Sequence, residues 1–489
     1  MHRLRTPCFA AGALGLCLFS IVACPTATTM PPSGVVFVLV DALRADHLGI
    51  YGYPRPTSPS LDGLARQGTL FTRAITASPW TLPAMGTVWT SLYPSVHGAT
   101  RMSNIQQWLT HRDSFQPVSV LAEEHVTLPE ILQSNGFATA AFVDGSYPRR
   151  VFGFGQGFDT FVEDGWRGVR LAVEASLEWL DEKRPSRFFL YLHTVQVHSP
   201  YSPPQNRSYR SDSDDPHERR VAQTLSSERE RYAGFDFDPD YEGDVDGSWA
   251  SLERLRHGAR PPPARDLEHL IACYDQGVAY TDYWLGKLVE GLRQRGLYER
   301  TALIVTADHG DEFFEHGGLE HGNSLYDELL LVPLIIRVPG VGERSVVEQQ
   351  ASLIDIMPTV LDLVNVEYRG MVQGSSLVPA MRGQSFPNRT LFAEATMLGG
   401  IKASRTNDSK YVERGGGKRQ ELYDLRTDPR ESNNLCAEDR SRCAGPAAEM
   451  RRWEEQMTAA AARLDLPDPH AARLDARTRE RLRALGYAE

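Results

Sequence analysis

Residues 35–53 read VVFVLVDALRADHLGIYGY, and this stretch decides the fold class. Its first six residues are apolar and mostly β-branched, which predicts a short strand that is buried on both faces. Similar apolar runs recur at 137–143, 188–192, 302–306 and 334–338. Stretches with helical patterning lie between and around them, at 59–67, 82–92, 127–135, 169–182, 266–293 and 353–364. Strands that alternate with helices predict an α/β fold with a largely parallel sheet between helices.

Groups suited to catalysis follow several of the predicted strands. The strand at 35–40 leads into Asp41, and the run at 302–306 leads into Asp308 and His309. Because open α/β sheets bind ligands at the carboxyl ends of their strands, we expect these side chains to lie together. A lone Asp after a strand is more often a turn residue or a helix cap. The coincidence of two carboxylates and an imidazole instead predicts a divalent-metal site.

Four further histidines lie near these segments. The run at 188–192 leads into His193, and His198 follows five residues later. His316 and His321 lie in EFFEHGGLEHGN, whose glycines let the backbone approach a ligand closely.

Thr81 opens the predicted helix at 82–92, within the sequence SPWTLP. Taken alone it is best explained as an N-cap, with Pro83 in the first turn. The same position suits a nucleophile, because a helix N-terminus attracts anions. A metal ion at this position would lower the pKa of the hydroxyl.

The N-terminus is predicted to be a signal peptide. Arg3 and Arg5 precede an apolar run at 8–22, which is shorter than the ~20 residues of a membrane-spanning helix. The sequence IVAC that ends at Cys24 resembles a bacterial lipoprotein cleavage box, in which Cys24 carries the lipid. Pro25 follows, so the aspartate of inner-membrane retention is missing. We expect an exported lipoprotein on the periplasmic or cell-surface face of the outer membrane, held by a lipid anchor. Ordinary cleavage a few residues later is the alternative.

Three cysteines remain beyond that segment. Cys436 and Cys443 lie seven residues apart in the polar sequence CAEDRSRC and could form a disulfide, which an exported compartment permits. Cys273 lies in an amphipathic helical pattern and is expected to be buried.

The charge balance bears on the binding partners. The net charge is −11, from 52 basic and 63 acidic residues. This diffuse acidity argues against nucleic acid, which requires a basic face. It leaves anionic small substrates open, because a site can be locally positive in an acidic protein.

The chain divides into five predicted parts. They are the signal peptide 1–23, a linker 24–33, a catalytic domain 34–385, a C-terminal subdomain 386–444 and a helical tail 445–489. Within the catalytic domain, residues 202–265 are rich in Ser, Asp, Arg and Pro and are predicted to be a surface insertion, with a lid over the site as one role. Acidic residues between 236 and 246 are out of register for an EF-hand and indicate a solvated loop.

Taken in order, the motifs resemble the sulfatase branch of the alkaline-phosphatase superfamily. They are VVFVLVDALRADHLGIYGY from residue 35, TSPSLDGLARQGTLFTRAITASPWTLPAMGTVWTSLYPSVHG from 57, GFD from 157, HTVQVHSPY from 193, TADHGDEFFEHGGLEHGNSLYDELLLVPLIIR from 306 and ELYDLRTDPRESNNL from 421. The resemblance implies a large mixed, mostly parallel sheet between helices, followed by a small C-terminal α+β subdomain.

The resemblance also implies a metal-ligand set. Asp41, Asp308 and His309 match metal ligands, and Thr81 falls at the nucleophile, where it would also touch the metal. The family's Asp-Asp pair is Asp41-Ala42 here, and its Asp-Asn pair is Asp308-His309. Replacing an oxygen ligand by imidazole shifts the preference from Ca²⁺ toward Zn²⁺ or Mn²⁺. A second metal ion is left open.

Three histidines receive roles by the same resemblance. His198 matches the histidine of the H-x-P element, which contacts the substrate or the leaving group. His321 lies twelve residues after His309, a spacing at which phosphoethanolamine transferases keep a site histidine. His193 is a weaker candidate for substrate binding.

The nucleophile segment departs from typical sulfatases, which read C/S-x-P-S-R and oxidise Cys or Ser to formylglycine. Residues 81–85 read TLPAM, and oxidation of Thr would give a ketone, so no formylglycine is expected. The Gly-Lys-Trp-His pocket motif is VDGS at 143–146, which removes two cationic contacts. A Thr nucleophile with Asp-His ligands instead resembles phosphoethanolamine transferases, lipoteichoic-acid synthases and phosphonate monoester hydrolases, although the last group uses formylglycine.

We therefore predict an exported, metal-dependent hydrolase or transferase that cleaves an anionic ester of a small molecule, a glycan or a lipid head group through a covalent Thr81 ester. A phosphodiester or phosphonate is favoured, because a Thr ester lacks the elimination route of a formylglycine adduct. The alternatives are an arylsulfatase-like sulfuric ester hydrolase without formylglycine, and a non-catalytic surface lipoprotein that retains the fold.

Overall fold

The computed structural model describes residues 30–100, 119–145, 147–163, 168–201, 240–256, 258, 261–395 and 400–464. Internal contacts divide the chain after Met30, and the elements described below belong to the unit Pro31–Glu489. The predicted signal peptide, Cys24 and residues 465–489 of the predicted tail lie outside the described residues. Among the helices that are described, none is long and apolar enough to cross a bilayer.

A mixed sheet forms the centre of the catalytic domain. The five predicted runs correspond to its strands β1 (Gly34–Val40), β3 (Ala138–Val143), β5 (Phe188–Thr194), β6 (Thr301–Thr306) and β9 (Leu331–Arg337). The described strands lie in the order β10-β2-β9-β6-β1-β5-β3-β4. β1 is parallel to both β5 and β6, whereas β9 is antiparallel to β6. Every residue of β1 is buried, as expected for a strand that is covered on both faces.

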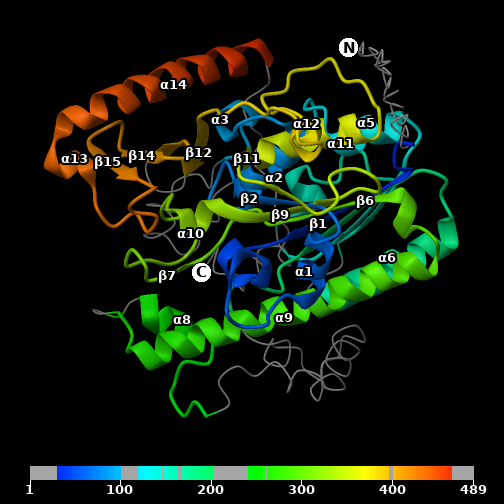
Figure 1. Ribbon diagram of the computed structural model, residues 1–489, viewed down its shortest axis with the longest axis horizontal. Coiled ribbons are helices and arrows are strands. Elements are labelled where there is room, and N and C mark those ends of the chain that lie inside the picture. The colour runs from blue at the N-terminus through cyan, green and yellow to red at the C-terminus, as the bar shows by residue number, and fades with distance from the viewer. Residues whose placement is uncertain are drawn as a thin grey trace, which may run out of the picture. The chain divides into compact units, whose positions relative to one another are not determined.

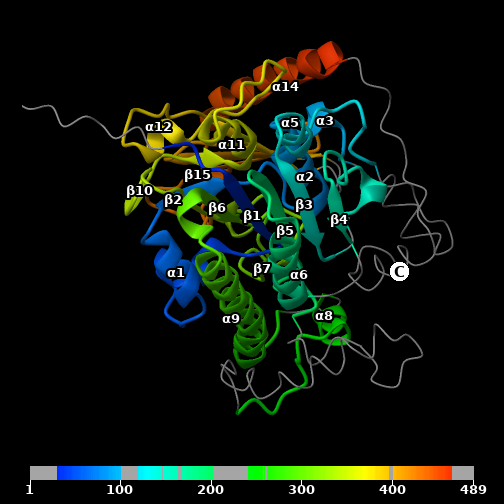
Figure 2. The same ribbon diagram turned by 90° about the vertical axis from the view of Figure 1, so that its right-hand side faces the viewer.

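Helices cover both faces of this sheet. The long helices α6 (Gly168–Lys183) and α9 (Ala264–Gln294) pack together on one face, with α1 (Pro59–Ala65) beside α9. The other face carries α2 (Thr81–Thr90), α5 (Leu128–Ser134) and α11 (Ile356–Leu363), as Figure 1 and Figure 2 show. The predicted α/β architecture is therefore confirmed.

Four further strands of the sheet were not predicted. They are β2 (Thr69–Ile75), β4 (Thr160–Val162), β10 (Ser345–Val347) and β11 (Ala351–Ser352). β2 is antiparallel to β9, and its register shifts between Phe71 and Ala74. Thr72 and Arg73 lie at this irregularity and are only half-buried, so the segment lacks the continuous apolar pattern of the other central strands.

A second, antiparallel sheet forms the C-terminal subdomain (Figure 1). Its strands follow in sequence order, β12 (Leu391–Ala395), β13 (Ile401–Arg405), β14 (Ser409–Arg414) and β15 (Arg419–Asp424). Helix α14 (Ala444–Leu464) packs against it, with the rings of Phe392 and Trp453 stacked at 4.5 Å. Cys436 and Cys443 form a disulfide before α14, while Cys273 is a buried free thiol in α9.

The predicted insertion is only partly described. Residues 202–239 lie outside the described residues. The remainder contains helix α8 (Trp249–Arg256), and α9 already begins at Ala264. The segment 202–265 is thus not irregular throughout, because its described part includes α8 and the start of α9.

Candidate active site

The strand register brings the predicted site residues to one edge of the sheet. Leu39 of β1 aligns with Thr306 of β6 and with His193 of β5. Asp41 and Asp308 each lie two residues beyond the aligned pair Leu39 and Thr306, so their side chains emerge at the same carboxyl edge. The sheet therefore assembles the carboxylates that the sequence separates by 267 residues.

Thr81 reaches this carboxyl edge from helix α2, which packs on one face of the sheet. Its Oγ1 lies 3.4 Å from Asp41 Oδ2 and 3.4 Å from His309 Nε2. Trp80 occupies the N-cap position, and Thr81 is the first residue of α2. The N-cap explanation of Thr81 is therefore wrong, and its hydroxyl is directed toward the predicted metal ligands instead.

The group of Asp41, Asp308 and His309, hereafter the active-site cluster, is buried and close-packed. His309 Nε2 lies 3.4 Å from Asp41 Oδ1 and 3.5 Å from Asp308 Oδ2. The Gly310 carbonyl lies 3.0 Å from His309 Nδ1 and accepts its proton, so the lone pair of Nε2 faces both carboxylates. The other oxygen of Asp308 accepts hydrogen bonds from the backbone N–H groups of Ala42 and His309.

This arrangement fits a divalent cation. Asp41 Oδ1 and Asp308 Oδ2 are buried and accept no hydrogen bond from the residues that the structure describes. Burial, together with the charges of Asp308 and Asp311, raises the pKa of Asp41 well above its ordinary 3.8. Carboxylate oxygens and an imidazole lone pair that face one another repel unless a positive charge lies among them. This donor set also suits Zn²⁺ or Mn²⁺.

His193 lies behind Asp41. Its Nδ1 is 2.8 Å from the carbonyl oxygen of Asp144, and its Nε2 is 3.8 Å from Asp41 Oδ2. Burial lowers its pKa to about 4, so the imidazole is neutral at pH 7. The ring is fully buried, so His193 is placed to hold Asp41 in position. Its predicted contact with substrate stays a prediction.

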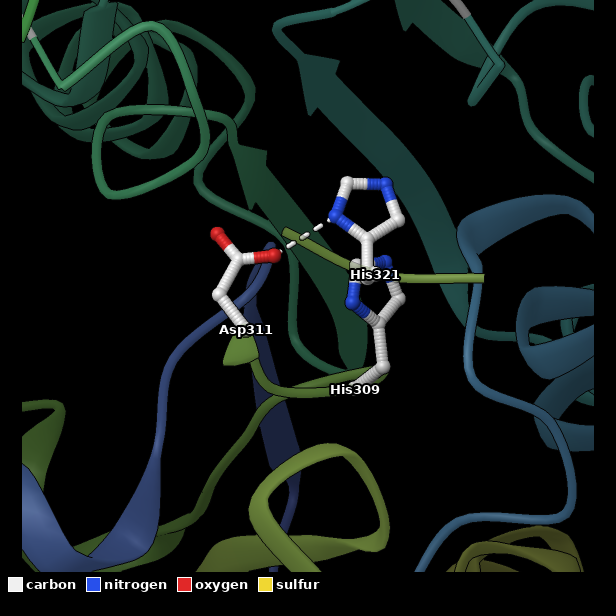
Figure 3. A group of neighbouring side chains, drawn as sticks. All are labelled: His309, Asp311 and His321. Atoms are coloured by element: carbon white, nitrogen blue, oxygen red, sulfur yellow. Dashed lines mark hydrogen bonds and ion pairs between the residues drawn. The ribbon is translucent and has the colours of Figure 1, made fainter. Parts of the chain in front are cut away.

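His198 and His321 form a second group of side chains beside the active-site cluster. Their ring centroids are 4.7 Å apart, and that of His321 is 4.3 Å from His309. His321 Nδ1 lies 2.6 Å from Asp311 Oδ1, the contact drawn in Figure 3. Burial and the neighbouring imidazoles lower the pKa of both residues well below 6.5. Both predicted histidines therefore lie beside the active-site cluster as neutral side chains.

Asp311 was not singled out in the sequence. One of its oxygens meets His321, and the other accepts a 2.7 Å hydrogen bond from Tyr201. Its position three residues after Asp308, in a loop just beyond a strand end, could have identified it. His309, Asp311 and His321 lie close enough to share a metal ion, but they use His309 in common with the active-site cluster, and a second ion stays a prediction.

His316 does not join the site. Its ring stacks on Tyr326 at 3.5 Å, and its Nε2 lies 3.6 Å from Glu328. With Glu328 and Glu431 it forms a separate group of potential ligands.

Comparisons with known proteins agree with the fold. Residues 33–366 match the family model described as Sulfatase, and residues 315–452 match the model described as N-sulphoglucosamine sulphohydrolase, C-terminal. A segment of 187 residues is 33% identical to arylsulfatase K of Bos taurus, and this match spans 35% of the chain and only 34% of that protein. An uncharacterized sulfatase, YidJ of Escherichia coli (strain K12), is 26% identical over 437 residues, which is 82% of each chain.

Two solved structures are similar in fold. The phosphonate monoester hydrolase of Agrobacterium radiobacter has a TM-score of 0.64 and 20% identity, covering 88% of this chain and 96% of its own. A protein solved in complex with its substrate D-glucosamine-2-N,6-O-disulfate has a TM-score of 0.63 and 18% identity, covering 90% of this chain and 99% of its own.

Proposed function

The chain belongs to the sulfatase family of ester hydrolases, and we propose that it cleaves a phospho-ester in preference to a sulfate ester, through a covalent ester on Thr81. One observation carries the proposal. A threonine hydroxyl lies 3.4 Å from both Asp41 and His309 at the N-terminus of a helix, in the position where a nucleophile would meet the metal ligands.

The first step is attack by Thr81. Its hydroxyl donates to Asp41 Oδ2, which orients the oxygen lone pairs toward the entering ester. A divalent ion held by Asp41, Asp308 and His309 would lower the pKa of this hydroxyl and offset charge on the ester oxygens. The positive end of the α2 dipole stabilises the same charge. The bond from Thr81 Oγ1 to phosphorus forms as the bond to the leaving oxygen breaks, and the Thr81 proton passes to Asp41 Oδ2, which already accepts it in a hydrogen bond.

His321 suits the second step. Asp311 accepts the Nδ1 proton of His321, so the Nε2 atom of this neutral ring carries no proton. This pairing resembles the carboxylate that fixes the tautomer of a general base. We assign His321 to deprotonating the water, or an acceptor alcohol, that displaces Thr81. His198 has the same tautomer, because its Nδ1 meets the Ser199 carbonyl. It protonates the leaving oxygen only after the anionic substrate has raised its pKa.

The preference for phosphorus follows from how Thr81 must be released. A Thr ester has no adjacent hydroxyl from which to eliminate the group, so the bond must be broken by direct displacement, which phosphorus allows more readily than sulfate. The second candidate is a sulfuric ester hydrolase. The sequence matches to arylsulfatase K and to YidJ favour it.

One assay separates the two candidates. The purified protein is analysed for bound metal and then assayed against p-nitrophenyl sulfate, phosphate, a phosphodiester and a phosphonate monoester. We expect a bound divalent ion and fastest turnover of the phosphodiester or phosphonate. Dominant sulfate turnover would overturn the preference for phosphorus, and a metal-free protein that is inert to all four would refute the mechanism.

We also propose that the protein is exported and anchored to the outer membrane through Cys24. The apolar run that ends at Cys24 supports this, as does the Cys436–Cys443 disulfide, which is typical of an oxidising compartment. Labelled palmitate should be incorporated into the wild type and not into Cys24→Ala. Equal labelling of both would contradict the anchor.

A further inference from the structure

The predicted insertion brings a basic residue to the active site. Arg256 is the last residue of α8, and its guanidinium forms an ion pair with Glu320 in β8 (Leu319–Glu320). It also lies 3.3 Å from Glu253, one turn earlier in the helix. The side chain of Glu320 is 5% exposed, whereas that of Arg256 is 31% exposed. The ion pair therefore extends from the buried site to the protein surface.

Glu320 connects Arg256 to the two histidines. It immediately precedes His321, and its carboxylate accepts a hydrogen bond from Ser199, the neighbour of His198. The φ angle of Glu320 is 65°, a left-handed conformation that is costly for a residue with a β-carbon. The charge of Arg256 is also close enough to lower the pKa of His321. Arg256 thus lies on the same side of the site as His198, assigned to the leaving oxygen, and His321, assigned to the water or alcohol that later takes its place.

Arg44, another arginine near the site, is placed differently. It is buried, and it pairs with Asp46, with Glu315 and with the carbonyl of Asp311. These partners fix it within the protein. Arg256 pairs with Glu320 and Glu253, and 31% of its side chain is exposed, so a ligand can reach it from solvent. A planar guanidinium binds carboxylate, sulfate and phosphate groups through paired hydrogen bonds.

We propose that Arg256 is a specificity residue, which binds a second anionic group carried by the leaving group of the substrate, and that Glu320 orients its guanidinium. The preferred substrate is then an ester whose leaving group bears a further carboxylate, sulfate or phosphate. This inference rests on the proposed function, because it assumes that His198 and His321 mark the leaving-group side.

The test compares two chromogenic esters of whichever acid the protein turns over fastest. One is the plain p-nitrophenyl ester, and the other carries a carboxylate next to the nitro group. The readout is the ratio of kcat/KM for the carboxylated ester to that for the plain ester. We expect Arg256→Gln to lower this ratio ~10-fold or more, mainly through KM, and Arg256→Lys to restore part of it. Arg254→Gln is the matched control, since Arg254 lies on the same helix turn and donates to the Asp244 carbonyl.

Two results would overturn the inference. One is an unchanged ratio in Arg256→Gln, and the other is an equal loss on both esters with a lower melting temperature, which would indicate a structural role. If the wild type turns over neither ester, the proposed function is refuted, and the inference about Arg256 is tested by binding instead. Calorimetric binding of the carboxylated ester to Thr81→Ala, with and without Arg256→Gln, then decides: a ~10-fold weaker Kd supports the inference, and equal Kd values or no binding refute it.

Discussion

Two buried groups of charged residues in this protein contrast with each other. The active-site cluster has two carboxylates, and among the described residues their ion pairs are with histidines alone. The second group, hereafter the subdomain cluster, joins the catalytic domain to the C-terminal sheet and consists of Asp327, Arg405, Lys410 and Glu431. Lys410 Nζ lies 2.9 Å from Asp327 and 2.8 Å from Glu431, and Arg405 lies 2.8 Å from Asp327.

The difference lies in charge compensation. The subdomain cluster balances two carboxylates with two cations, which lower the pKa of Asp327 well below 3.8, although burial raises the pKa of Glu431 to about 7. In the active-site cluster, burial and like charges instead raise the pKa of Asp41. A buried charge must be paired, so the subdomain cluster is paired as folded, while the active-site cluster is suited to bind a cation from solution. Of these two buried clusters, the incompletely paired one is the one that we propose to be functional.

Loss of the nucleophile should give the largest effect, and it concerns the active-site cluster alone. Thr81→Ala should reduce kcat/KM by ~10⁴-fold or more, because it removes the hydroxyl that forms the covalent ester. Thr81→Ser should keep much of the activity. Steady-state assays on the fastest p-nitrophenyl ester measure both variants. An active Thr81→Ala enzyme would show that Thr81 is not the nucleophile.

Breaking the subdomain cluster should cost stability. Lys410→Met removes a fully buried cation and leaves Asp327 and Glu431 facing each other. The free energy of unfolding should fall by about 3–5 kcal/mol, measured by urea denaturation. A change below about 1 kcal/mol would mean that the cluster is not held by its charges. Arg426→Met, at an exposed ion pair with Asp424, is a matched control that should cost far less.

In the active-site cluster, removal of a charge should raise the free energy of unfolding instead of lowering it. In metal-free protein, Asp308→Asn should raise the free energy of unfolding by about 1–2 kcal/mol, because it removes repulsion between buried carboxylates. Thermal unfolding in the presence of EDTA measures the change. Destabilisation of the metal-free protein would indicate that Asp308 is already compensated within the fold.

The pH dependence of stability should also differ between the two clusters, and these changes should be smaller than those predicted above. The folded pKa of Asp41 is raised, so in metal-free protein this carboxyl should lower stability as pH rises from 3.8 through the folded value. The folded pKa of Asp327 is lowered, so its stabilisation is present above 3.8 and is lost as pH falls through the folded value. Melting curves from about pH 1 to about pH 8 should show the effect of Asp41→Asn above pH 3.8 and most of the effect of Asp327→Asn below it. A parallel change in both variants would remove the distinction.

The sequence predicted the parts of the fold that have continuous apolar patterning. β1 and its neighbours carry such runs, and the residues that follow them, Asp41, Asp308 and His309, converge because parallel strands end at one edge. β2 was missed because it includes the half-buried Thr72 and Arg73 at an irregular register. Its pairing with β9 is a tertiary contact that local pattern does not reveal.

The unpredicted site residues depend on contacts between distant segments. Glu320 and Arg256 are 64 positions apart, and their ion pair exists only because α8 packs beside β8. Asp311 gains a role from its contacts with His321 and Tyr201. The subdomain cluster likewise draws on residues from 327 to 431, so its balance of charge could not be read from spacing.

The metal content of three proteins tests whether the active-site cluster is a metal site, measured by mass spectrometry after dialysis against Zn²⁺ or Mn²⁺ and removal of free ions. We expect about one tightly bound divalent ion per chain in the wild type, none in Asp308→Asn, and the wild-type content in Lys410→Met. A wild type that holds no ion, or an Asp308→Asn variant that holds as much as the wild type, would contradict this expectation.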